Sequence, residues 1–352
     1  MKRLFLILLS FLLFWPARAQ EDASAPADEQ VDVVGIIFDH IGDAYDWHIA
    51  TIGGHHISIP LPVIVYSRTE GFHAFMSGKL AHGASYAGFT IGPEGKVVET
   101  ATGERPMLDI SITKNVASLM ISCALLLWLI LGTARWYRRH DVLKEKPSGL
   151  AALMEPLVMM IHDMARENIG EKDYRRFSPY LCMAFLFILL NNFLGIVPFF
   201  PGGANLTGNI AVTLVLALFT FFTVNIFGTK HYYKDIFNPD VPVFLKPIMP
   251  VIEVFSALMK PVSLTIRLFA NMLAGHIMIL SMVCVIFIMA KYGAVLTGSM
   301  SAVSVFFGVF LDALECLVAF IQAYVFTMLS SIYIGLAQAH GEEEHKTINN
   351  KS

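Results

Sequence analysis

Charged residues are scarce in this chain. Only 15% of its 352 residues are Asp, Glu, Lys or Arg, whereas 55% are hydrophobic, and the mean hydropathy is +0.61. This balance is too apolar for a soluble protein of this length and predicts a polytopic membrane protein. The net charge of -3 is close to neutral, so the composition indicates no basic surface for nucleic acid.

Cysteine and catalytic motifs are equally sparse. The four cysteines, Cys123, Cys182, Cys284 and Cys316, lie in apolar stretches without metal-ligand spacing, which favours buried free thiols over disulfides. The chain has no nucleotide-binding loop and no nucleophile motif, so neither an enzyme of its own nor a cofactor is predicted. It also lacks the repeated halves with matching broken helices that secondary transporters usually show.

The N-terminus has the three parts of a secretory signal peptide. Residues 1–19 begin Met-Lys-Arg, continue through an apolar block and end in Ala17-Arg18-Ala19, a typical cleavage site. A retained first helix is the alternative, but the apolar block from Leu4 to Trp15 is short for a membrane span. We therefore predict that residues 1–19 are removed and that the new N-terminus is exported.

Residues 20–33 are acidic and rich in Ala and Pro, which predicts a disordered leader. Residues 34–114 then predict a small β-rich exported domain, because short β-prone runs alternate with Gly and Pro. The predicted strands are Ile57–Tyr66, Tyr86–Ile91, Lys96–Thr100 and Leu108–Thr113. The domain holds six histidines without zinc-ligand spacing, so surface and structural roles are favoured over a metal site: His40, His48, His55, His56, His73 and His82.

Residues 115–340 form the predicted membrane domain, with five crossings. The predicted spans are Val116–Thr133, Pro179–Phe200, Thr207–Phe227, 248–289 and 301–337. The last two stretches are long: 248–289 would measure ~60 Å as one helix, about twice a bilayer core, so such a helix must tilt, kink or emerge. Residues 149–169 are amphipathic, which favours an interfacial helix over the alternative of a re-entrant segment.

The cation distribution predicts the orientation of these spans. The first span is followed by a basic cluster, which by the positive-inside rule belongs in the cytoplasm: Arg135, Arg138, Arg139, Lys144 and Lys146. Lys230 and Lys234 close the third span in the same way. We therefore predict an external N-terminal domain and a cytoplasmic tail at residues 341–352.

Arg267 stands in the middle of an apolar stretch, and this position needs an explanation. A central Arg in a span costs about 2.5 to 3.5 kcal/mol on insertion scales. It is either a structural residue held by a buried carboxylate or by carbonyls, or it lines an ion path. At 100° per residue, Ser263, Arg267 and Asn271 share one stripe of the helix, which favours a functional surface.

Further polar residues flank Arg267 along the two long stretches. Glu253 lies ~21 Å along the helix towards the cytoplasm, and His276 lies ~13 Å outward. On the last helix Glu315 and Gln322 share a face, and Asp312 lies one turn outward of Glu315. The titratable groups on both sides of a fixed cation suit proton transfer through the low-dielectric region, although His276 alone would also suit a structural helix–helix contact.

The segment P-V-S-L-x-x-R-L-F-x-N-M-x-A-G, from Pro261 to Gly275, resembles the signature helix of subunit a of the F-type ATP synthase. The resemblance continues through A-F-I-Q-A-Y-V-F around Gln322, and N-x-x-G-x-x-P from Asn192 resembles another stretch of that family. It covers residues 115–338. It implies an all-α polytopic fold with a non-catalytic, proton-conducting role in the bacterial inner membrane.

The resemblance also assigns partners and roles. It implies that the c-ring supplies the carboxylate that passes Arg267, and that the peripheral-stalk subunit b and the remaining F1Fo subunits complete the complex. By resemblance, Arg267 is the essential arginine, Asn271 and Gln322 support it, and His276 with Glu315 forms the outer half-channel pair. Glu253 resembles the acid of the cytoplasmic half-channel. A secondary transporter with a site at Arg267 and a structural scaffold are the alternative functions.

Overall fold

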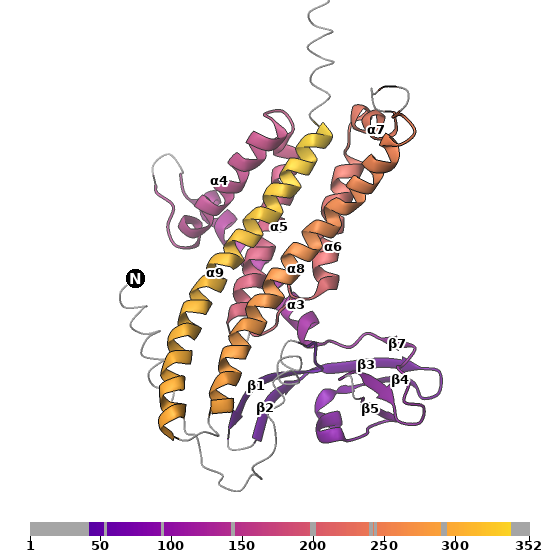
Figure 1. The fold of residues 1–352 in the computed structure, drawn as a ribbon, viewed down its shortest axis with the longest axis vertical. Helices are drawn as coiled ribbons and strands as arrows, with labels where there is room; N and C mark the ends of the chain where they lie inside the picture. The colour runs from indigo at the N-terminus through magenta and orange to yellow at the C-terminus, as the bar shows by residue number, and fades with distance from the viewer. Residues whose placement is uncertain are drawn as a thin grey trace, which may run out of the picture.

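The structure is a computed structural model that describes residues 42–52, 55–92, 95–141, 145–197, 202–238, 242, 245–289 and 294–338. The predicted signal peptide, leader and cytoplasmic tail lie outside these residues. Figure 1 shows a helical bundle with a group of strands at one end. The helices are α3 (Lys114–Arg139), α4 (Leu150–Ile169), α5 (Tyr174–Ile196), α6 (Ile210–Ile226), α7 (Lys230–Phe237), α8 (Met249–Met289) and α9 (Ala294–Gln338).

The helices confirm the prediction of a polytopic all-α membrane protein. Among the described residues, four helices are long and apolar enough to cross a membrane: α3, α5, α8 and α9. Helix α6 bends by 100° into α7, and this pair provides a fifth crossing if it counts as one broken span. The prediction missed α7, whose first turn is capped by Thr229 through a hydrogen bond from the Tyr232 amide.

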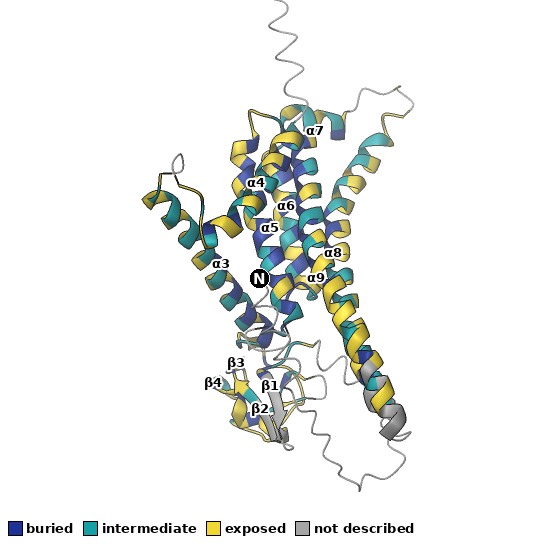
Figure 2. Cartoon of the chain, turned by 90° about the vertical axis from the view of Figure 1, so that its left-hand side faces the viewer, coloured by how far each residue is buried: buried dark blue, intermediate teal, exposed yellow. Residues whose placement is uncertain are grey.

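Helix α5 forms the centre of the bundle. Half of its most apolar window is buried, against 17% in α3, α8 and α9, and Figure 2 shows the difference. Helix α5 packs against α3, α4 and α9, with Leu181, Phe185 and Ile188 fully buried. The outer helices therefore leave apolar faces that lipid or partner subunits must cover.

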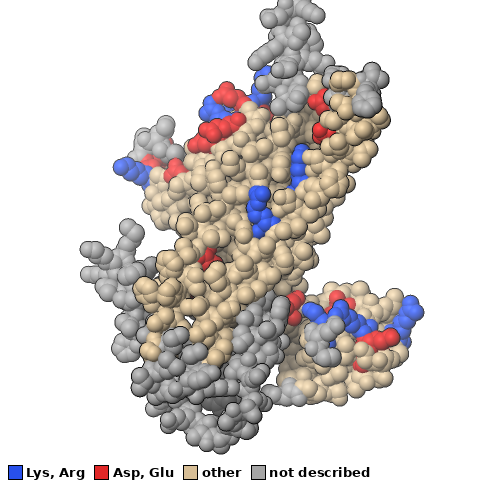
Figure 3. Space-filling view, viewed as in Figure 1, with Lys and Arg blue, Asp and Glu red and all other residues tan. Residues whose placement is uncertain are grey.

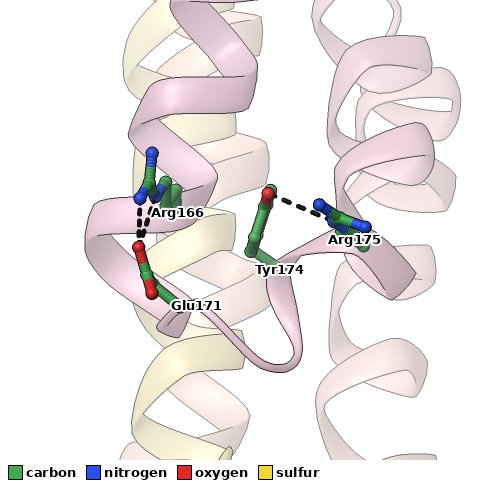
Figure 4. Close-up of polar contacts among 4 residues, drawn as sticks. All are labelled: Arg166, Glu171, Tyr174 and Arg175. Atoms are coloured by element: carbon green, nitrogen blue, oxygen red, sulfur yellow. Dashed lines mark hydrogen bonds and ion pairs between the residues drawn. The ribbon is translucent and has the colours of Figure 1, made fainter.

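Helix α4 is not among the helices apolar enough to span. It packs against α3, α5 and α9, with Met154, Ile161 and Ala165 buried. Figure 4 shows the connection to α5, where Arg166 donates hydrogen bonds to Glu171 and Arg175 Nε donates to the Tyr174 hydroxyl. The bonds from Arg166 lower the pKa of Glu171, but both side chains are exposed, so the pair adds little stability.

Helices α8 and α9 form a long antiparallel hairpin. They contain 41 and 45 residues, so they measure ~60 and ~68 Å. The prediction of two very long helices is therefore confirmed. The end of α8 and the start of α9 lie at the strand end of the molecule, and α7 lies at the opposite end (Figure 1).

Three small antiparallel sheets form the strand region. They are β1 (Asp46–Ile52) with β2 (His55–Pro60), β3 (Pro62–Ser67) between β4 (Gly71–Met76) and β7 (Leu108–Asp109), and β5 (Phe89–Ile91) with β6 (Val97–Glu99). A short 3-10 helix, η1 (Ser77–Gly83), follows β4. The core contains Tyr45, Val63, Val65, Phe75, Leu80, Phe89 and Val97.

The strand predictions were wrong in detail. The predicted strands 86–91 and 108–113 are shorter in the structure, at Phe89–Ile91 and Leu108–Asp109. The predicted strand 57–66 is two strands, β2 and β3, because the chain changes partner at Leu61. Strands β1 and β4 were missed. In β4 the sequence Gly-Phe-His-Ala-Phe-Met has no β-branched residue, so its propensity signal is weak and the pairing with β3 decides its structure.

The strand region is tied directly to the first span. The Lys114 amide donates to the Ala44 carbonyl at 2.8 Å, and the Asn115 amide donates to Asp43 Oδ1 at 3.1 Å. Asp43 thus caps α3 from 72 residues away, in place of the adjacent Thr113, which makes no side-chain cap bond. A carboxylate at a helix N-terminus also interacts favourably with the helix dipole.

Candidate functional site

His276 of α8 and Glu315 of α9 meet inside the hairpin. His276 Nδ1 lies 2.9 Å from Glu315 Oε1, and the side chains are 14% and 5% exposed. This contact confirms the predicted approach of the two residues. Nδ1 also lies 3.1 Å from the Met272 carbonyl oxygen, so one ring proton can serve either acceptor.

The Glu315 carboxylate is unusual for a buried acid. Neither of its oxygens accepts a well-aligned hydrogen bond among the described residues. A buried charge without fixed donors is strongly destabilised, whereas a neutral carboxyl is tolerated. In the part of the chain that the structure describes, the polar group in contact with this carboxylate is the His276 imidazole.

Two glycines lie beside this pair. A Cβ atom on Gly275 would lie 2.8 Å from Glu315 Oε1 and 3.1 Å from its Cδ. A Cβ atom on Gly195 of α5 would lie 3.6 Å from His276 Cε1 and Nε2, which is ordinary contact. In the sequence, the Ala274-Gly275 pair was recognisable only as part of the motif from Pro261 to Gly275. The motif did not predict the close approach of Gly275 to the Glu315 carboxylate.

Gly275→Ala is expected to displace the Glu315 carboxylate and to reduce proton pumping several-fold, because the added methyl would lie only 2.8 Å from Oε1. The matched control is Gly308→Ala on α9, where nothing lies within 4 Å of the added Cβ. ATP-driven acidification of inverted membrane vesicles measures both variants. Equal activity of the two variants would show that the Gly275 contact is irrelevant to function.

Helix α5 contributes a third polar group beside this pair. Asn192 is fully buried, and its Nδ2 donates to the Ala319 carbonyl of α9 at 3.0 Å. Ala319 lies one turn after Glu315. The bond joins α5 to α9 and confirms the helix-packing role predicted for this asparagine.

Two contacts define the register of the antiparallel hairpin. His276 lies beside Glu315, and Lys260 Nζ lies over the Tyr333 ring at 5.2 Å from its centroid. Arg267 is nine residues before His276, so it lies opposite Tyr324, nine residues after Glu315. By the same counting Gln322 lies opposite residues 269–271. This counting agrees with the expectation that Gln322 lies near the level of Arg267.

Arg267 is exposed on the outside of the hairpin. Leu264, Leu268 and Met272 form the buried stripe of α8, whereas Ser263 and Arg267 are exposed. Asn271 and Gln322 are half-buried. In Figure 3 a few basic side chains and an acidic one lie on the mostly tan face of the long helices.

The Arg267 guanidinium has no carboxylate partner in the described part of the chain. No ion pair joins it to Glu315, which instead contacts His276, and Asp312 is exposed without a hydrogen bond or ion pair. The alternative of a structural pair between Arg267 and either acid is therefore not supported. The arrangement leaves a cation at mid-helix that a group outside this chain can approach.

The other end of the hairpin carries the remaining polar groups. Glu253 is half-buried and interacts electrostatically with Tyr232 and Lys260. A small cavity of about 10 Å³, enough for a single water molecule, lies here between α6, α8 and α9. Its polar lining consists of Thr220, Asn225, Tyr232, Lys260 and Tyr333.

Comparison with known proteins identifies the family of this chain. The model of the ATP synthase A chain family matches residues 116–335, more than half of the chain. The chain belongs to the ATP synthase A chain family. The match includes α3 to α9 almost completely and contains every predicted site residue. It confirms the resemblance inferred from the Pro261–Gly275 motif.

Individual members of the ATP synthase A chain family agree with this assignment. The chain is 41% identical over 306 residues to ATP synthase subunit a of Chlorobium phaeobacteroides (strain DSM 266), covering 80% of this chain and 85% of that protein. It is 46% identical over 245 residues to ATP synthase subunit a 2 of Chlorobium luteolum, covering 67% and 69%. Residues 36–117 match a second family, described as a domain of unknown function.

Proposed function

We propose that this chain is the proton-conducting stator subunit of the membrane Fo sector of an F-type ATP synthase. The observation that carries the proposal is the exposed Arg267, which has no carboxylate partner among the described residues and lies between an acid–imidazole pair and Glu253. Such a cation requires a carboxylate from a neighbour. A rotating c-ring in the same membrane provides one, and the relatives named ATP synthase subunit a support this partner.

The two half-channels follow from the positions along the hairpin. His276 and Glu315, with Asp312 one turn beyond, lie towards the strand end and form the outer half-channel. Glu253, ~21 Å from Arg267 along α8, forms the inner one at the opposite end. A proton passes between the halves only on a ring carboxylate, because the fixed charge of Arg267 raises the barrier to direct passage.

Arg267 has a second role in this mechanism. A guanidinium beside a carboxylate favours the ionised form. A ring carboxylate that reaches Arg267 therefore releases its proton to one half-channel and accepts another from the opposite half-channel after it leaves. Ser263, Asn271 and Gln322 lie on or near the same surface and orient the groups at this contact.

The proposed function is tested on the intact complex, purified through a tag on this chain from bacterial inner membranes. We expect co-purification of a small two-helix proteolipid, a peripheral stalk containing subunit b and a soluble ATPase. ATP-driven acidification of reconstituted vesicles should not require Na⁺, since an imidazole–carboxylate pair is suited to protons. A purified chain without these partners, or acidification that needs Na⁺, would contradict the proposal.

The proposed orientation places the strand region outside and residues 341–352 in the cytoplasm. In a background without the four native cysteines, Ser352→Cys should resist a membrane-impermeant thiol reagent in intact spheroplasts. Ser85→Cys, at an exposed position of the strand region, should react readily and is the control. Labelling at Ser352 with protection at Ser85 would reverse the orientation.

A further inference from the structure

The three-stranded sheet has one face that the protein core does not use. Along β3, Val63, Val65 and Ser67 are buried, whereas Tyr66 is exposed. The register places Tyr66 directly between Phe72 and Leu108, and the Ile110 amide bonds to the Ile64 carbonyl in the next row. The apolar sheet face consists of Ile64, Tyr66, Phe72, Met76, Leu108 and Ile110.

The apolar sheet face is unusually open to its surroundings. Phe72 is 66% exposed, Ile110 is 61% exposed and Leu108 is 50% exposed. An antiparallel sheet with one solvated face normally carries polar residues there. A contiguous exposed apolar patch instead marks a surface that contacts another molecule or a membrane.

The position of this face indicates what it contacts. The core residues lie on the other side of the sheet, and in Figure 1 β5 lies farther from the helices than β3 and β7 do. The apolar sheet face is therefore turned towards the helical, membrane-spanning part of the molecule. Ile110 precedes the start of α3 at Lys114 by four residues, which span at most about 14 Å.

The apolar surface continues from the sheet into the first span. Val116 and Met120 of α3 are exposed, and both belong to a helix long and apolar enough to cross the membrane. The sheet face and the lipid-facing side of α3 thus form neighbouring parts of one surface. Lipid that surrounds the outer end of α3 lies within reach of the sheet.

Two arginines at the rim of the sheet face have the sign of charge that a bacterial membrane surface attracts. Arg68 is exposed in the turn after Tyr66, and its Nε donates to Met107 Sδ at 3.4 Å. Arg105 is exposed just before Met107. Glu70, in the same turn as Arg68, lies against Gly88 beside β5, on the core side of the sheet. Arg beside aromatic and aliphatic side chains is typical of surfaces that bind anionic lipid headgroups.

We propose that the apolar sheet face rests on the surface of the bilayer that holds the spans. Tyr66, Phe72 and Leu108 enter the headgroup region, and Arg68 and Arg105 lie beside lipid phosphates. The strand region is then held at both the first turn of α3 and the membrane surface. This inference requires only that α3 spans the membrane, so it stands independently of the proposed proton-conducting function.

The test uses the full-length chain in its purified complex, reconstituted in vesicles of phosphatidylethanolamine and phosphatidylglycerol. A bimane label is attached at Phe72→Cys, in a background without the native cysteines, and its quenching by doxyl-labelled lipid is compared with quenching by aqueous iodide. Phe72 is mostly exposed, so the change removes no core contact. We expect lipid quenching at residue 72 and iodide quenching at the control Ser85→Cys.

Two outcomes would overturn the proposal. Iodide quenching alone at residue 72 would show that the face lies in water. Protection from both quenchers would show that a protein, either a partner subunit or a second copy of this chain, covers it. A label at Ala74→Cys provides a second position on the same face.

The contribution of the basic rim is measured separately. Arg68→Glu combined with Arg105→Glu should reduce lipid quenching at residue 74 at least about twofold in vesicles with phosphatidylglycerol, because basic residues near an anionic surface are attracted to it and acidic ones are repelled. The same substitutions should change little in vesicles of neutral phosphatidylcholine. An equal effect in both kinds of vesicle would contradict the electrostatic part of the proposal.

Discussion

Arg267→Ala is expected to reduce ATP-driven proton pumping to the level of vesicles without the complex. The side chain is the exposed mid-hairpin cation that we propose to discharge the ring carboxylates, and no other Lys or Arg lies at this level of α8 or α9. Without it, a ring carboxylate keeps its proton, and the two half-channels are no longer separated. Acidification and ATP hydrolysis should be measured on the same vesicles.

Arg267→Lys is the more discriminating substitution. Lys keeps the charge but lacks the planar guanidinium fork and titrates more readily in a desolvated position. We expect at least about a tenfold loss of pumping, which corresponds to about 1.4 kcal/mol of lost stabilisation. Met278→Leu, at an exposed position of α8 outside the proposed site, is the control and should retain most activity. Near-normal pumping by Arg267→Lys would show that a mere positive charge suffices.

His276 and Glu315 are expected to behave as one unit in a double-mutant cycle. Each single change to Ala should slow proton entry markedly, because the remaining partner stays in a desolvated site without the group 2.9 Å away. The exchange of His276→Glu with Glu315→His restores one imidazole and one carboxylate. It should recover more pumping than the product of the two single exchanges, with a coupling of about 0.5 to 3 kcal/mol.

A control double-mutant cycle uses Asp312, on the same helix as Glu315. Asp312 is one turn from Glu315 but is exposed and makes no hydrogen bond or ion pair with His276. A cycle of His276→Glu with Asp312→His should therefore be additive. Strict additivity in the His276–Glu315 cycle, with coupling to Asp312 instead, would move the outer half-channel to Asp312.

Much of the membrane part could be predicted because apolar runs and helical period follow from local sequence. The lengths of α8 and α9, the shared stripe of Ser263, Arg267 and Asn271, and the level of Gln322 all depend only on the 3.6-residue repeat and on the antiparallel pairing of two long helices. The motif around Arg267 was specific enough to indicate the family.

The strand region was less predictable. β1 and β4 were missed, and the single strand predicted over residues 57–66 proved to be two. Strand propensity reflects packing against neighbours, and in small sheets those neighbours are distant in sequence. The cap of α3 by Asp43 is a further example, because no pattern near Lys114 indicates a partner 72 residues earlier.

By itself the sequence determined the fold class, the order and length of the spans and the family, because each follows from hydrophobic runs or from a contiguous motif. Only the tertiary structure decided that Gly275 lies against the Glu315 carboxylate, that Asn192 bonds to α9, and that Arg267 finds no carboxylate among the described residues. These facts depend on distances between helices. The identity and spacing of side chains along one helix do not predict the distances between helices. Close packing of the helices against one another sets these distances.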